Sequence, residues 1–474
     1  MSRGDSEPGR TGNRSSHISR RDCLRAGFAA GLAGGLAGLA KHPAVAQNLA
    51  AGITPSARGY FHPWLNDPIV EAVAGGVPPQ RVQLTPDGLT SGLCGAVQHY
   101  RAVVEAGGWP VIPDPGLVLE RDVTDRAVGL LRRRLRLSGD LPGVADQTSD
   151  TFDVSLENAV KAFQSRHGLE ADGAVGPATL AELNVPANVR LATLVINVER
   201  ARQWAKDYGD RFIAVNIAAG RLHLIEGGNT VFDTRVIVGR IDRTTPIIHS
   251  KITRLDFNPF WYCPDSIARR DLLPAIQTDP DYFFNNGIRV LTSFSNGAEE
   301  IPPEEIDWFS YDGIDNLPYK FRQDPGPWNV LGPVRFNFNN NHSVYLHGTS
   351  NEELFEQATR TFSSGCVRVD GALDISAYLA SAHDKWDVDR VQGVVESYKT
   401  RSVTLDDPMP VHLIYRTAWV DHDGTVQFRP DVYDWDAVLD IKWRHVADVP
   451  CVYGLRQNAE QRVLDANASF ANGG

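Results

Sequence analysis

Cys366 and His347 are the residues of this 474-residue chain whose types and surroundings best suit covalent chemistry. A cysteine attacks as its thiolate, and a neighbouring imidazole can remove the thiol proton. The cysteine directly follows Gly365, and a glycine lets the backbone turn sharply beside the thiol. Because a lone cysteine or histidine is more often a buried structural residue, the prediction depends on the pair and its context.

The segments around these two residues predict the elements that position them. Residues 343–349 alternate in the manner of a short strand that ends at Gly348. Side chains two apart on a strand share a face, so Tyr345 and His347 are expected to point the same way. A capping-box pattern then predicts a short helix over residues 350–360. The predicted order is strand, helix and turn, with the histidine and the cysteine 19 residues apart.

The two segments together resemble the catalytic motif of the YkuD-type L,D-transpeptidases. That motif has a His-Gly or His-Asp pair followed by Ser/Thr-x-Gly-Cys-x-Arg, and here it reads His347-Gly348 and Ser363-Ser364-Gly365-Cys366-Val367-Arg368. Many members have a second histidine where this chain has Ser364. The YcbB-like branch also has serine there, so the chain resembles that branch, and His347 is the one motif histidine available as a base.

The resemblance implies a role for each residue in acyl transfer. Cys366 would attack a peptide carbonyl, and His347 would take the thiol proton and pass it to the leaving amine. The backbone carbonyl of Gly348 would orient the imidazole. The backbone N–H groups of Gly365 and Cys366 would stabilise the oxyanion, with the Tyr345 hydroxyl as a weaker candidate.

Five further residues are expected at the substrate. Arg368 either holds a substrate carboxylate or braces its loop, and the sequence favours neither. Ser363 and Ser364 either donate to substrate or shape the turn, and the second role is favoured. Trp261 and Tyr262 precede a segment that resembles the inserted capping subdomain of YcbB-like proteins.

Hydrophobic periodicity and turn residues divide the chain into several parts. We expect a multidomain α+β protein, with an N-terminal scaffold segment over residues 47–116 and a C-terminal tail over residues 441–474. Residues 117–186 resemble the three-helix peptidoglycan-binding module, through Ala159-Val-Lys-Ala-Phe-Gln and Asp172-Gly-Ala-Val-Gly-Pro. A helical bundle that only supports its neighbour remains the alternative.

The remaining large segment is the expected catalytic domain. Residues 187–440 become rich in alternating, β-branched patterns broken by glycine, which predicts a mostly-β domain. The capping subdomain is expected at residues 264–322, as a lid over substrate or as an insertion without function.

The first 46 residues have the pattern of an export signal. A twin-arginine sequence at residues 19–24 precedes a Gly/Ala-rich apolar run, and a small-residue cleavage site precedes Gln47. We therefore expect a periplasmic protein, exported by the twin-arginine route and without a stable membrane span. Removing residues 1–46, which hold seven Lys/Arg and three Asp/Glu, leaves a net charge of −15. That charge argues against nucleic acid and anionic membrane as partners.

Cysteine and histidine spacing indicates no metal site, and no cofactor is implied. Four cysteines remain after cleavage. If Cys366 is a free nucleophile, the sequence allows either a Cys94–Cys451 or a Cys263–Cys451 disulfide and does not decide between them.

The resemblance implies a peptidoglycan L,D-transpeptidase that acts on stem peptides and glycan. It would release D-Ala from a tetrapeptide donor through a cysteine thioester and form 3–3 or 1–3 cross-links, and carbapenems would acylate its cysteine. We expect a monomer, with other wall enzymes as conceivable partners. An L,D-carboxypeptidase or amidase that hydrolyses the same bond and a non-catalytic wall-binding protein are the alternatives.

Overall fold

The computed structural model describes residues 86–142, 149–203, 208–312, 317–382 and 386–436. The expected export signal, the C-terminal tail and Cys451 lie outside these residues. None of the described helices is both long enough and apolar enough to cross a membrane.

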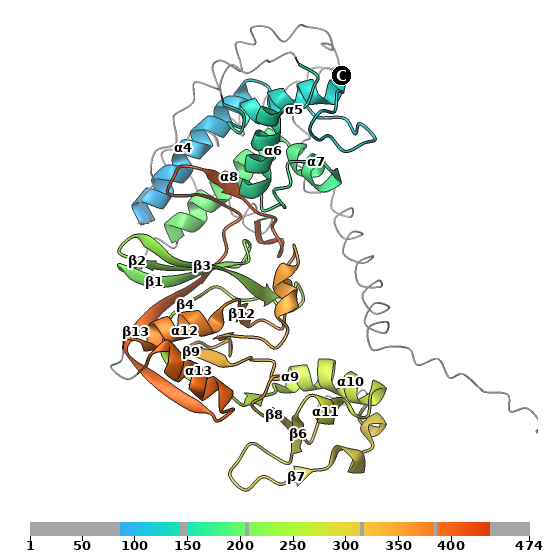
Figure 1. The fold of residues 1–474 in the computed structure, drawn as a ribbon, viewed down its shortest axis with the longest axis vertical. Coiled ribbons are helices and arrows are strands. Elements are labelled where there is room, and N and C mark those ends of the chain that lie inside the picture. The colour runs from blue at the N-terminus through green and yellow to red at the C-terminus, as the bar shows by residue number, and fades with distance from the viewer. Residues whose placement is uncertain (1–85, 143–148, 204–207, 313–316, 383–385, 437–474) are drawn as a thin grey trace, which may run out of the picture. The chain divides into compact units, whose positions relative to one another are not determined.

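The N-terminal part is helical, as its periodicity predicts (Figure 1). It contains α4 (Pro86–Glu105), α5 (Arg126–Leu137), α6 (Val154–Arg166), α7 (Pro177–Leu183) and α8 (Ala187–Gln203). Asp125 and Asp153 cap α5 and α6 by accepting hydrogen bonds from the backbone of the first turn. Pro177 begins α7, where its missing N–H costs nothing.

Two main cores hold these helices, and a small third cluster of Val103, Leu137 and Ala187 joins α4, α5 and α8. Leu131, Leu135 and Phe163 belong to a core between α5, α6 and α7. Leu93, Val97 and Leu194 join α4 to α8, and the hairpin of β14 (Ala418–Val420) and β15 (Val426–Phe428) packs into the same core. The last strands of the chain therefore return to the helices near its beginning.

A nine-stranded sheet follows, in the order β11-β3-β12-β10-β9-β4-β13-β1-β2. An additional pairing of β3 with β2 closes the sheet on itself. Its strands are β1 (Arg211–Asn216), β2 (Arg221–Glu226), β3 (Asn229–Gly239), β4 (Ile248–Phe257), β9 (Val334–Phe338), β10 (Leu346–His347), β11 (Thr361–Ser363), β12 (Val367–Val369) and β13 (Arg401–Ile414). The helices α12 (Ala372–Ala380) and α13 (Val388–Glu396) share the core of this sheet.

Residues 261–323 form a smaller unit with a sheet and a core of its own, which we call the cap. Its sheet has the order β5-β8-β6-β7, with β5 (Trp261–Tyr262), β6 (Ile288–Leu291), β7 (Glu300–Ile301) and β8 (Lys320–Gln323). The helical segments are α9 (Asp265–Ile267), a π-helical turn (Ala268–Leu272), α10 (Leu273–Thr278), α11 (Tyr282–Asn285) and two 3-10 turns (Pro303–Glu305 and Trp308–Tyr311).

Two local predictions at the motif are wrong. The strand expected over residues 343–349 is limited to β10, because Ser343 has a positive φ of 55° and pairing with β12 extends over two residues. The helix expected over residues 350–360 is only a 3-10 turn, Glu352–Glu356, because Asn351 precedes it without a side-chain capping bond.

Candidate active site

Cys366 lies in a tight loop between β11 and β12, which we call the nucleophile loop (residues 363–366). The buried Ser363 hydroxyl organises it by accepting a hydrogen bond from the Gly365 N–H at 3.0 Å and donating to the Cys366 carbonyl. Gly365 has a φ of 117°, a conformation in which a side chain would be strained. The loop therefore depends on a serine and a glycine at these positions to present the thiol.

His347 lies on β10 between two arginines. It pairs with Arg335 of β9 and with Arg368 of β12, and side chains of paired residues share one face of a sheet. The Val367 N–H donates to the Tyr345 carbonyl at 3.1 Å, so the thiol of residue 366 lies beside Tyr345 in the same register. The sheet thus brings the thiol, the phenol, the imidazole and Arg368 together.

The imidazole of His347 is fixed in one tautomer. Its Nδ1 lies 2.6 Å from the Gly348 carbonyl oxygen, and a carbonyl can only accept, so Nδ1 carries the proton. Nε2 then has a free lone pair and can act as a base. Glycine is required here because a Cβ on residue 348 would lie 2.9 Å from Pro333 Cδ.

Burial keeps both reacting groups neutral. Burial lowers the pKa of His347 to about 3, and the Arg368 and Arg335 charges add to this, against the opposing bonds to the Gly348 and Leu331 carbonyls. Burial raises the pKa of Cys366 to about 11, although hydrogen bonds from Tyr345 and the charge of Arg368 oppose it. The resting pair is therefore a thiol and a neutral imidazole, not a thiolate and an imidazolium.

Comparison with known proteins places this site in a family. Residues 210–392 match the family described as "L,D-transpeptidase catalytic domain" (YkuD), and residues 124–183 match "Putative peptidoglycan binding domain". The first match contains His347, the nucleophile loop and the cap. Residues 210–392 are an L,D-transpeptidase catalytic domain of the YkuD family.

A curated protein of Haemophilus influenzae (strain ATCC 51907 / DSM 11121 / KW20 / Rd), named "Putative L,D-transpeptidase", is 34% identical over 248 residues. The match covers 52% of this chain and 49% of the relative, so the chain spans about half the length of that protein. The L,D-transpeptidase domain and the helical peptidoglycan-binding domain together give the expected multidomain α+β class.

Three solved L,D-transpeptidases are also similar. The one from Mycobacterium smegmatis has 10% identity and a TM-score of 0.21, and the match covers 43% of this chain and 58% of that one. The one from Xylanimonas cellulosilytica has 16% identity and a TM-score of 0.20, with coverage of 64% and 99%. The one from Stackebrandtia nassauensis has 15% identity and a TM-score of 0.24, with coverage of 64% and 96%.

The Cys366 thiol donates to the Ser343 carbonyl at 3.9 Å, and a second polar neighbour in the L,D-transpeptidase domain is Tyr345. Its hydroxyl hydrogen-bonds the Cys366 sulfur, and its ring lies edge-on to the His347 ring at 5.8 Å. The Arg335 guanidinium lies 5.3 Å from the centre of the Tyr345 ring and is held by Asp256 at 2.7 Å. No local pattern in the sequence marks Arg335 or Asp256, because only strand register places them here.

Arg368 is the cation beside the nucleophile. Its side chain is half-buried, burial lowers its pKa, and the negative form of Cys366 opposes that shift. Within the described residues its guanidinium has neither an ion pair nor a hydrogen bond. Of the two roles open to Arg368, this arrangement favours contact with a ligand over bracing of the loop.

The structure contradicts three of the expected roles. Ser363 is 2% exposed and bonded inside its own loop, so it shapes the turn and cannot reach substrate. The Gly365 N–H is already bonded to that hydroxyl, so it is not a free oxyanion donor. Trp261 is buried in the core of the cap, because the strand that carries it pairs with β8.

The other expected contact residues are accessible. Ser364 is exposed and accepts a hydrogen bond from Arg243 at 2.8 Å. Tyr262 is 49% exposed and lies edge-on to Phe294 at 5.2 Å, on the surface of the cap.

The cysteines outside the motif differ in state. Cys94 is disulfide-bonded, whereas Cys263 is a free and buried thiol. The Cys263–Cys451 bridge that the sequence left open is therefore not formed. Among the described residues, no cluster of three His, Cys, Asp or Glu side chains could hold a metal ion.

The neutral pair predicts how alkylation of the thiol depends on pH. Because the pKa of Cys366 is raised to about 11, the reactive thiolate fraction grows until that pH. The rate of iodoacetamide labelling should rise about tenfold for each pH unit between about pH 6 and 10. Labelling followed by mass spectrometry, with Cys366→Ala as the background, measures it. A rate that is already constant near neutral pH would mean a preformed thiolate.

Proposed function

We propose that this protein is a periplasmic peptidoglycan L,D-transpeptidase that works through a thioester on Cys366. The observation that carries the proposal is the fixed tautomer of His347, with Nε2 free as a base on the same face as the thiol. A binding protein would have no use for that arrangement. The family match of residues 210–392 supports the same reaction class.

The reaction begins when Sγ of Cys366 attacks the carbonyl between the third stem residue and D-Ala. Nε2 of His347 takes the thiol proton as the bond forms, since neither group is charged at rest. The proton passes to the leaving amine, D-Ala departs, and the acyl group remains as a thioester. An amine of a second stem then attacks, which forms the cross-link and restores the thiol.

The substrate is a peptide whose carboxylate is recognised by Arg368. Its guanidinium has no partner among the described residues and lies next to the nucleophile. We further propose that the helical domain at residues 124–183 contacts peptidoglycan, on the basis of its family match. The export signal at residues 1–46 would deliver the protein by the twin-arginine route.

Incubation of the protein with purified tetrapeptide muropeptides tests this function. Mass spectrometry should show cross-linked dimers and released D-Ala, and fragmentation identifies whether the third or the first residue of the acceptor carries the bond. Tripeptides and D-Ala without dimers would make water the acceptor and the protein an L,D-carboxypeptidase. Unchanged muropeptides would contradict catalysis.

The cap is proposed to act as a lid because Asp271 of the cap pairs with Arg243 and Arg240, which both bond to the nucleophile loop. Arg243 bonds Asp271 of the cap at 2.6 Å and the Ser364 hydroxyl at 2.8 Å, through the same nitrogen. The carboxylate raises the pKa of Arg243, so this guanidinium stays charged. Movement of the cap would therefore shift the loop that carries the thiol.

Asp271→Asn should weaken substrate use without disturbing the thiol. We expect KM for the muropeptide donor to rise about two- to fivefold, the size expected for a partly exposed ion pair. Asp265→Asn is the matched control, since Asp265 binds Lys320 inside the cap at 2.7 Å. Equal kinetics for the two variants would refute the link between the cap and the nucleophile loop.

A further inference from the structure

The carbonyl oxygen of the Gly365–Cys366 peptide unit accepts a hydrogen bond from a residue outside the motif. The hydroxyl of Thr245, which is fully buried, donates to the Gly365 carbonyl at 2.8 Å. A peptide unit is planar and trans, so its carbonyl and its N–H point in opposite directions. Fixing the Gly365 oxygen therefore fixes the direction of the Cys366 N–H.

That N–H is the donor the reaction needs. Within the described residues it has no hydrogen-bond acceptor, whereas the neighbouring Gly365 N–H is occupied by Ser363. A hydrogen bond to the carbonyl end of a peptide also polarises the unit and makes its N–H a stronger donor. Thr245 can thus orient and strengthen one oxyanion donor without touching substrate.

Thr245 is itself held by the hydroxyl of Tyr433. This hydroxyl accepts from the Thr245 N–H at 3.2 Å and donates to the Gly239 carbonyl at 2.6 Å, which closes the loop between β3 and β4. The Gly239 N–H completes the arrangement by donating to the Thr245 hydroxyl at 2.8 Å. The backbone packs so closely here that residue 239 must be glycine, because a Cβ on it would lie 2.1 Å from the Arg243 carbonyl.

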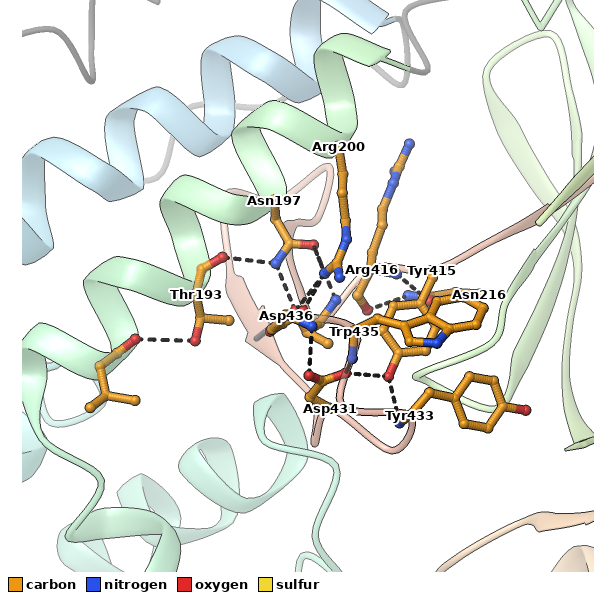
Figure 2. Close-up of polar contacts among 12 residues, drawn as sticks. Thr193, Asn197, Arg200, Asn216, Tyr415, Arg416, Asp431, Tyr433, Trp435 and Asp436 are labelled. Atoms are coloured by element: carbon orange, nitrogen blue, oxygen red, sulfur yellow. Dashed lines mark hydrogen bonds and ion pairs between the residues drawn. The ribbon is translucent and has the colours of Figure 1, made fainter. Parts of the chain in front are cut away.

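Tyr433 lies in the segment after β15 and is anchored in turn by Tyr415, which directly follows β13 (Figure 2). Its N–H donates to the Tyr415 hydroxyl at 3.0 Å, which donates to Asp431 at 2.5 Å. Asp431 also accepts from the backbone of Asp436, whose carboxylate pairs with Arg200 of α8 at 2.5 Å. A continuous set of buried polar contacts therefore leads from α8 to the nucleophile loop.

We propose that Thr245 and Tyr433 are positioning residues that aim the Cys366 N–H at the developing oxyanion. The inference rests on the acyl transfer proposed above. It predicts a defect specific to attack on a carbonyl, because only that reaction places negative charge on an oxygen beside the loop.

Two reagents separate this role from a general structural one. With p-nitrophenyl acetate, the sulfur bonds to the carbonyl carbon through an oxyanion, p-nitrophenolate leaves, and the thiol proton passes to His347. With iodoacetamide, the sulfur displaces iodide at a saturated carbon and no oxyanion forms. Both rates are measured on the full chain, per titratable Cys366 thiol.

Thr245→Val should slow acylation by about 10- to 100-fold and change alkylation by less than about twofold. Tyr433→Phe should do the same to a smaller degree, since it acts through Thr245. Thr245→Ser keeps the hydroxyl and should restore acylation. Thr244→Val is the matched control, because the Thr244 hydroxyl makes no hydrogen bond within the described residues.

Wild-type acylation in Thr245→Val, or an equal fall of both rates in Thr245→Val and Tyr433→Phe, overturns the inference. Wild-type protein that is alkylated but not acylated overturns it as well. Muropeptides left unchanged by a wild-type protein that is acylated by the ester would contradict the proposed function alone.

Discussion

Cys366→Ala is expected to abolish the conversion of tetrapeptide muropeptides, with a loss of at least about 10⁴-fold in kcat/KM. No other described thiol can replace it, because Cys94 is disulfide-bonded and Cys263 is buried with a strongly raised pKa. The fold should persist, since residue 366 lies in a loop and alanine fits its backbone. Product analysis by mass spectrometry measures the loss, and circular dichroism checks the fold.

Cys263→Ala is the matched control for that experiment. It removes a free thiol of the same chain from the core of the cap, where the sulfur donates a hydrogen bond to the neighbouring carbonyl of Pro264 at 3.5 Å. Its kcat/KM should stay close to wild type. Activity that survives in Cys366→Ala, or disappears equally in both variants, would refute a thioester on Cys366.

His347→Gln is expected to lower kcat/KM for acyl transfer by about 10²- to 10⁴-fold, the usual worth of a general base. Glutamine fills much of the same volume but cannot accept the thiol proton. Alkylation above about pH 9 should be unaffected, because hydroxide then supplies the thiolate. His342→Gln, in the exposed loop before β10, is the control and should resemble wild type.

The pH profile of the wild-type enzyme gives a second test of the base. Burial lowers the pKa of His347 to about 3, so its imidazole is already neutral well below physiological pH. Acyl transfer should therefore remain nearly constant from about pH 8 down to about pH 4, even though alkylation falls steeply over the same range. A loss of activity centred between about pH 6 and 7 would contradict a buried neutral base.

Local sequence was sufficient for much of this protein. The pair His347 and Cys366, with Gly365 before the thiol, predicted the nucleophile and its base through the resemblance of these residues to a family motif. Helical periodicity and the resemblance of residues 117–186 to a three-helix module predicted the helices before the sheet. These features can be predicted from the sequence because they depend on neighbours within a few residues.

The residues that support the site could not be predicted from the local sequence. Asp256, Arg335 and Arg368 line up only because β4, β9, β10 and β12 are adjacent in the sheet, although the cap separates β4 from β9 in the chain. Thr245 and Tyr433 are 188 residues apart, yet they meet at one hydroxyl. Nothing in their own surroundings in the sequence marks either residue.

The roles that were wrong have the same physical origin. Ser363 and Trp261 have side chains that suit substrate, but burial and hydrogen bonding commit the first to its turn and the second to the core of the cap. The sequence by itself determined which groups can react, because reactivity follows from residue type. Only the tertiary structure decided which donors are free, which charges are paired and which pKa values shift, because burial and strand register are properties of the folded chain.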